Sequence, residues 1–126
     1  MSIKTDLNNI ETLVRNGVYP DSPSVLSYYF DIAESMVSSQ LIPQQKWFIF
    51  VRVSQTLLDV IYDQRVDIQW RELCVDNIYK PILQLKRLSK TEQEWAELRS
   101  IQYQLSNSAR QFHAQELCHK HSSFAS

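Results

Sequence analysis

Apolar residues recur at helical spacing along almost the whole of this sequence. In the first segment, Ile3, Leu7, Ile10 and Val14 fall on one face of an α-helix. The only glycine of the chain, Gly17, follows this stripe. Glycine is typical of the position just after a helix, where the backbone often turns left-handed. The pattern therefore predicts a first helix that ends at Gly17.

A second helix is predicted after a loop at residues 18–21. Asp21 or Ser22 can cap it, and Pro23 falls in its first turn, where a missing N–H costs nothing. The segment 41–42 then interrupts the helix, and Pro43 opens the next one in the same way. The apolar stripe of this second helix consists of Leu26, Tyr29, Ala33, Met36 and Val37.

The third segment, residues 44–64, is the most apolar of the chain and is predicted to be a central, buried helix. Its apolar residues cover most of the helix circumference, as in a helix surrounded by others. The alternative is a strand over residues 47–53, which are rich in aromatic and β-branched side chains. The apolar pattern continues to Ile61 without a hairpin partner, and this favours the helix.

Two further helices are predicted. Asp67 can cap a helix over residues 67–88, in which Pro81 removes one backbone hydrogen bond and predicts a kink or a break at residues 77–80. A capping box, either Ser89–Glu92 or Thr91–Glu94, then opens the last helix. The apolar stripe of that helix consists of Trp95, Leu98, Ile101, Leu105, Ala109 and Phe112.

These segments predict an all-α fold, a single-domain bundle of four or five helices over residues 1–121. Short connections between helices favour antiparallel neighbours. Residues 122–126 are expected to form a frayed C-terminal tail.

Composition removes several classes of function. A chain of 126 residues with one glycine cannot form the glycine-rich loops that hold nucleotides or the sharp turn of a nucleophile elbow. The longest apolar run, residues 47–51, is too short to cross a bilayer, so no membrane association is expected. The N-terminus has no apolar signal segment, and the two cysteines have no framework spacing, which together predict a cytoplasmic protein.

Charge is distributed unevenly along the chain. The formal net charge is −1, which argues against a dedicated nucleic-acid binder. Residues 1–76 carry ten acids and six bases (−4), whereas residues 77–126 carry four acids and seven bases (+3). No acid occurs between Asp76 and Glu92, and this segment is either a solvated helix end, a basic patch for an acidic partner or a weak nucleic-acid site. Its cations are Lys80, Lys86, Arg87 and Lys90.

Groups that could support catalysis or bind a metal are incomplete. Asp59 and Asp63, and likewise Glu72 and Asp76, share helix faces, but no histidine accompanies them as a helix-bundle metal site requires. Cys74 has the character of a small core residue, with a Cys74–His113 dyad as the alternative. The remaining candidate metal ligands are all near the C-terminus, namely His113, Glu116, Cys118, His119 and His121.

Aromatic residues off the predicted core faces are the most informative feature. Tyr28, Trp70 and Tyr103 lie away from their helix stripes, and Arg71 is beside Trp70. Such residues dominate protein interfaces, although a bundle with several buried faces could also use them inside. Together with Lys86 and Arg87, they suggest a non-catalytic, cofactor-free protein-interaction module: an adaptor, an inhibitor, an immunity or antitoxin-like protein, or a homodimer. The alternatives are a metal-binding protein or metal-dependent enzyme that uses the C-terminal histidines and Cys118, and a weak nucleic-acid binder that uses residues 80–90.

Overall fold

The computed structural model is a bundle of α-helices without strands in the part of the backbone that it describes, residues 3–39 and 42–125. Side chains are described for residues 5–39, 42–108 and 110. The predicted all-α fold is confirmed, and the alternative strand over residues 47–53 is wrong. In chain order the helices are α1 (Ile3–Asn16), α2 (Pro23–Ser38), α3 (Pro43–Tyr62), α4 (Ile68–Asn77), α5 (Tyr79–Leu88) and α6 (Glu92–Ala125).

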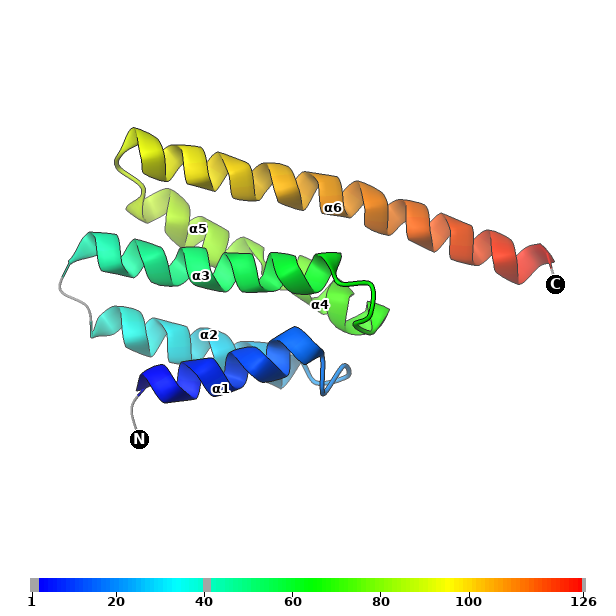
Figure 1. Ribbon diagram of the computed structural model, residues 1–126, viewed down its shortest axis with the longest axis horizontal. Helices are drawn as coiled ribbons and strands as arrows, with labels where there is room; N and C mark the ends of the chain where they lie inside the picture. Colours follow the sequence, from blue (N-terminus) through cyan, green and yellow to red (C-terminus); the bar gives the residue numbers. More distant parts are fainter. Residues whose placement is uncertain (1–2, 40–41, 126) are drawn as a thin grey trace.

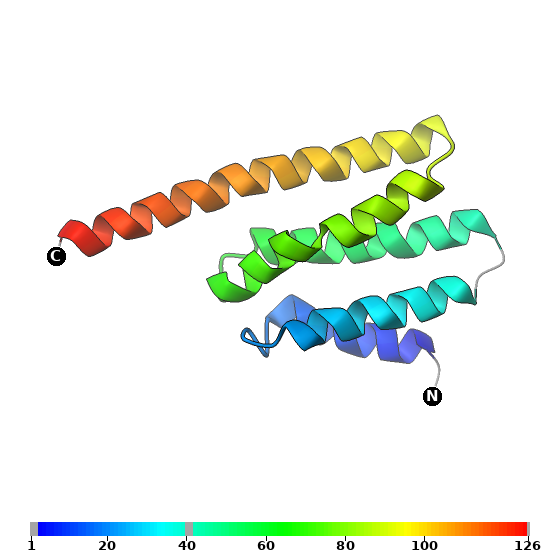
Figure 2. The same cartoon turned by 180° about the vertical axis from the view of Figure 1, so that it is seen from behind.

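The central position predicted for the third helix is confirmed. α3 contacts each of the other five helices, with α1 and α2 on one side and α5 and α6 on the other (Figure 1). Seen from behind, α5 crosses in front of α3, and α2 lies in front of α1 (Figure 2). Because α3 is covered from several directions, its buried residues occupy much of its circumference: Trp47, Ile49, Phe50, Val53, Ser54, Thr56, Leu57, Leu58, Val60 and Ile61.

Two features require glycine at position 17, where the first helix ends. Its φ of +57° lies in the left-handed region, which side chains with a Cβ rarely adopt. A Cβ at this position would also lie 2.8 Å from Val66 Cγ1 and 3.0 Å from Trp70 Cδ1. The single glycine of the chain therefore stands where the end of α1 meets α4.

The helix predicted over residues 67–88 is divided into α4 and α5. Asp67 caps α4, and its Oδ1 accepts a hydrogen bond of 2.8 Å from the Gln69 amide. Ile78 separates the two helices but keeps right-handed helical angles, with φ −64° and ψ −21°. Pro81 follows in the first turn of α5, and without an N–H it cannot continue the hydrogen-bond ladder to Asn77. The predicted break is confirmed at residues 77–79.

Of the two alternative capping boxes, the second forms. The Glu94 amide donates to Thr91 Oγ1 at 3.1 Å, and the Thr91 amide donates to Glu94 Oε1 at 3.1 Å. The alternative at Ser89 is wrong because the Ser89 hydroxyl is buried and occupied elsewhere. It donates to the Leu85 carbonyl at 2.7 Å and accepts from Trp47 Nε1 at 3.0 Å.

Helix α6 is much longer than the rest of the bundle. Its 34 residues extend about 51 Å at the usual helical rise. The N-terminal part packs on α3 and α5, and the remainder projects beyond them (Figures 1 and 2). The helix includes residues 122–125, whereas Ser126 lies outside the described residues, so the frayed tail stays a prediction. In the described part, no helix combines the length and apolar character that crossing a membrane requires.

Candidate functional site

Trp70, predicted to lie off the core face, is completely buried. Its Nε1 donates a 2.8 Å hydrogen bond to the Val14 carbonyl at the end of α1. Its burial agrees with the alternative that a bundle with several buried faces uses such residues inside, because the end of α1 covers a second face of α4. Trp70 thus joins α1 to α4 and offers no surface to a partner in this structure.

Arg71 is also buried, and it is positioned by the end of α3. Its Nε donates to the Ile61 carbonyl at 2.9 Å, in the last turn of that helix. The last carbonyls of a helix have no partner within the helix, and a cation there also interacts favourably with the helix dipole. Arg71 therefore supports the C-terminus of α3 rather than a protein interface, a role that helical spacing does not reveal.

The other four predicted partner-binding residues are exposed. Tyr28 on α2 and Tyr103 on α6 are 55% and 69% accessible, respectively. Lys86 and Arg87 are exposed in the last turn of α5. These residues belong to three different helices, and only Lys86 and Arg87 are neighbours.

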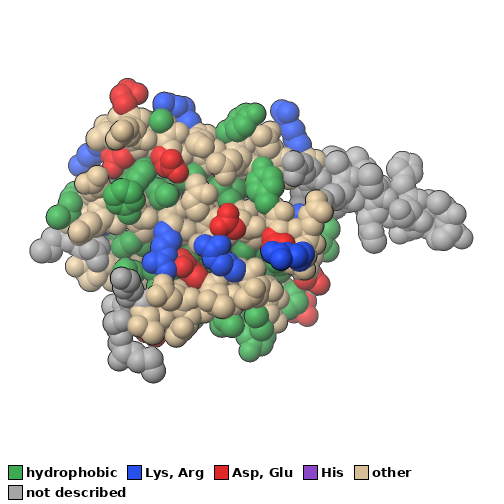
Figure 3. Space-filling model, viewed as in Figure 1, with side chains coloured by type: hydrophobic (Ala, Val, Ile, Leu, Met, Phe, Trp, Pro, Cys, Tyr) green, Lys and Arg blue, Asp and Glu red, His purple; other side chains and the backbone are tan. Residues whose placement is uncertain are grey.

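A polar network joins α1, α2 and α3. The buried Glu11 carboxylate accepts from the Tyr29 hydroxyl at 2.6 Å and from Arg52 Nη2 at 2.7 Å. Arg52 also donates to Asn8 Oδ1 at 2.6 Å. Burial raises the pKa of Tyr29, and the hydrogen bond to Glu11 raises it further. Figure 3 shows acidic and basic side chains in a row across this face of the molecule. Because Glu11 is already bound by two donors, we interpret the network as structural.

The predicted acidic pairs are divided among separate partners. Asp59 forms an ion pair of 2.8 Å with Arg15, and Asp63 forms one of 3.0 Å with Arg65. No group of three or more potential metal ligands occurs in the described part of the chain. The side chains of His113, Glu116, Cys118, His119 and His121 lie outside the described residues, so the C-terminal metal site stays a prediction.

Cys74 is a core residue, as its sequence context predicted. Burial raises the pKa of its thiol to about 12, so at neutral pH the sulfur is protonated and a poor nucleophile. The alternative dyad partner, His113, has no described side chain.

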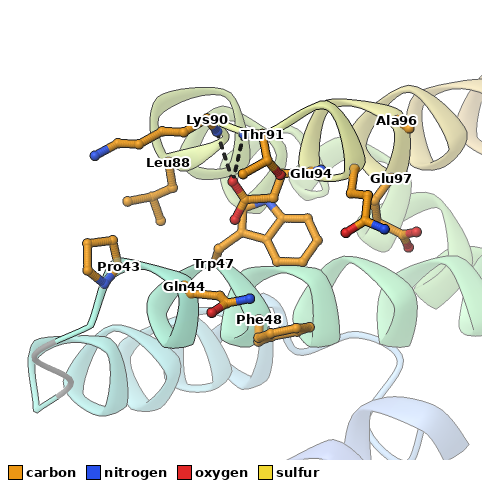
Figure 4. A pocket seen from close by; sticks show the side chains of 11 residues that line it. Pro43, Gln44, Trp47, Phe48, Leu88, Lys90, Thr91, Glu94, Ala96 and Glu97 are labelled. Atoms are coloured by element: carbon orange, nitrogen blue, oxygen red, sulfur yellow. Dashed lines mark hydrogen bonds between the residues drawn. The ribbon is translucent and has the colours of Figure 1, made fainter.

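A hollow of about 760 Å³ lies between the first turns of α3 and α6 (Figure 4). Trp47 and Phe48 line it from α3, in an edge-to-face arrangement with ring centroids 5.2 Å apart. Glu94 lines it from α6, but its carboxylate accepts the Lys90 and Thr91 amides, and these hydrogen bonds lower its pKa. The described lining contains no His, Cys or Ser. Its ionisable groups are Lys90, Glu94 and Glu97, and the Thr91 hydroxyl is part of the cap of α6.

A second hollowed region lies between α2 and α5 and over α3. It comprises two adjoining hollows of about 210 and 310 Å³ that share Glu34, Phe50 and Gln84. We call this region the α2–α5 groove. Its lining residues are Phe30, Ala33, Glu34, Val37 and Ser38 of α2, Lys46, Phe50 and Val53 of α3, and Lys80, Pro81, Leu83, Gln84 and Leu88 of α5.

Cations border the α2–α5 groove. Lys80 Nζ lies 5.5 Å from the centroid of the Phe30 ring, across one of the two hollows. Lys46 lines the other. Within the described part of the chain, Lys80, Lys86 and Arg87 form no salt bridge. The sequence marked these cations but not the groove, because helical spacing does not show which helices lie beside one another.

The chain matches no known protein family, no curated protein and no solved structure. Its function is therefore inferred from its own surface.

Proposed function

We propose that this protein is a non-catalytic protein-interaction module, an adaptor or inhibitor of the kind that includes immunity proteins, and that it binds its partner through the α2–α5 groove. The observation that carries the proposal is the groove itself, an apolar depression bordered by cations that form no salt bridge with the described residues.

Apolar exposure beside the groove supports this proposal. Leu83 is 50% accessible and lines the groove, and Tyr79 is 53% accessible one helical turn earlier on α5. Single exposed apolar residues are normal on soluble proteins, but contiguous ones bordered by polar groups are typical of interaction sites. Leu83 shares its hollow with Phe50 and Val53, which form an apolar floor.

The size of the hollows favours side chains over a small ligand. Pockets that enclose drug-sized molecules usually measure roughly 300–1,000 Å³ and bury most of the ligand. Each hollow here, of about 210 and 310 Å³, is at or below the lower limit and is open along the groove. Such depressions can accept individual apolar side chains of another protein.

The proposal is tested by native mass spectrometry of the untagged protein, purified from its own cells. We expect a complex with one defined second protein, and we expect Leu83→Glu to abolish it, because the carboxylate would stand at the apolar wall of the groove. Ile68→Glu is the control, since Ile68 is similarly exposed (44%) but lies at the start of α4. Both variants should unfold at the wild-type temperature.

Two results would contradict the proposal: the absence of any complex, or a complex that Leu83→Glu leaves intact. The same spectra report a homodimer, the other predicted partnership, directly from the mass. The cytoplasmic location stays a prediction that fractionation of the same cells can check.

A further inference from the structure

We infer that the α2–α5 groove receives an acidic amphipathic helix of the partner protein. This inference rests on the proposed function and adds the chemistry of the partner. The apolar face of the partner's helix would fill the two hollows, and the carboxylates of that helix would face the cations of α5.

The shape of the groove favours a helical occupant. Its walls are the two helices α2 and α5, and α3 forms the floor. The backbone groups of helix interiors are hydrogen-bonded within each helix, so these walls have no free edge to which a partner could add a strand. The two hollows adjoin along the groove and share Phe50 at their junction. Two apolar side chains one or two turns apart on a helix can enter them together.

The charges of the groove select an acidic occupant. Among the described lining residues, Lys80 lines one hollow and Lys46 the other, and Glu34, the only acid, lines both. Arg87 follows Lys80 by seven residues on α5 and so lies on the same helix face, two turns further along. Lys86 lines neither hollow and lies on a face of α5 turned away from the groove.

The cations remain available for a partner. Surface cations are often matched by acids on the same or a neighbouring helix, as Arg15 is by Asp59 and Arg65 by Asp63. The described segment between Asp76 and Glu92 contains no acid, and Lys80, Lys86 and Arg87 form no salt bridge with the described residues. Carboxylates of a bound helix would supply the missing charges and would also accelerate association.

The test uses the full-length protein and a displayed library of peptides of about 15 residues, near the length at which an isolated helix becomes stable. Leucines are placed at helical spacing on one face, and every other position varies among Glu, Lys, Gln and Ala. We expect selection on the wild type to enrich Glu over Lys. Leu83→Glu should weaken the selected peptides about tenfold or more, as loss of a central anchor does.

Charge-reversal variants show whether α5 recognises the acids. Lys80→Glu combined with Arg87→Glu should shift the enrichment from Glu towards Lys, whereas Arg99→Glu, at an exposed position of α6, should leave it unchanged. Enrichment of Lys on the wild type, no enrichment at all, or an equal effect of Arg99→Glu would overturn the inference. So would binding to phosphatidylserine vesicles or duplex DNA that the α5 reversals abolish while no peptide is enriched. A native complex that Leu83→Glu disrupts, together with no preference for acidic peptides, would refute the acidic helix but leave the proposed function standing.

Discussion

At the scale of single residues, buried polar groups determine how the helices are joined. The indole N–H groups of Trp47 and Trp70 each have an acceptor on another helix or at its end, Ser89 Oγ and the Val14 carbonyl. Buried polar groups without a partner cost about 1–3 kcal/mol, so these bonds select one arrangement of the helices over others. Both tryptophans therefore contribute apolar area and a directional constraint.

Ser54 is the exception among the described buried side chains. It lies in the middle of α3, and its hydroxyl has no hydrogen-bond partner in the described part of the chain. Ser54→Ala removes this hydroxyl and should raise the free energy of unfolding by about 1 kcal/mol more than a surface Ser→Ala change in a helix. Urea denaturation of Ser54→Ala and of the control Ser27→Ala, at an exposed position of α2, measures the difference. Equal gains in the two variants would show that Ser54 is satisfied in solution.

The buried thiol of Cys74 should make the free energy of unfolding depend on pH in the alkaline range. Burial raises the pKa of the folded thiol from 9.0 to about 12, so the unfolded chain releases this proton first. The stabilising contribution is fully present below pH 9 and is lost as the pH rises towards 12, by about 1 kcal/mol between pH 9 and 10. Cys74→Ala should lower stability at pH 7 but remove this component of the slope. Urea denaturation under reducing conditions at pH 7, 9 and 10 checks it, and identical slopes would contradict it.

At the scale of helices, each start and stop has a local cause. Gly17 ends α1, Asp67 caps α4, and Pro81 separates α5 from α4. Helix α6 begins at the reciprocal bonds between Thr91 and Glu94 and contributes Leu98 and Ile101 to the core. The quality of its cap should therefore affect the stability of the whole domain.

Thr91→Ala tests this cap. The change removes the acceptor of the Glu94 amide and should lower the free energy of unfolding by about 1 kcal/mol, as for other threonine caps. Thr91→Ser retains a hydroxyl and should remain within a few tenths of a kcal/mol of the wild type. The measurement is chemical denaturation monitored by circular dichroism. A serine variant as unstable as the alanine variant would indicate that the hydroxyl is not the reason.

At the scale of the whole molecule, the arrangement around α3 creates both the core and the candidate surface. α1 and α2 pack on one side of α3, α5 and α6 pack on the other, and the α2–α5 groove remains where α2 and α5 face each other across α3. The Glu11–Tyr29–Arg52 network joins the three consecutive helices α1, α2 and α3. Its contribution to stability exists only in the folded bundle, where the three helices pack together.

Glu11→Gln should lower the free energy of unfolding by about 2 kcal/mol, because a buried carboxylate that binds Arg52 and Tyr29 becomes a neutral amide. The matched control is Asp59→Asn, which changes an exposed ion pair and should cost no more than about 1 kcal/mol. Thermal and urea denaturation compare the two. Equal losses would mean that burial does not strengthen the interaction of Glu11 with its partners.

The sequence by itself determined the all-α fold, the central position of α3, the stop at Gly17, the cap at Asp67 and the break near Pro81. Each of these depends on spacing along one helix or on the chemistry of a single residue, which the linear order contains. Tertiary structure alone decided that Trp70 and Arg71 are buried, that Ser89 accepts the Trp47 indole, and that Thr91 rather than Ser89 caps α6. It also decided that the cations of α5 border an apolar groove. The reason is that a helix in a bundle has more than one buried face, and only its neighbours in space determine which faces are covered.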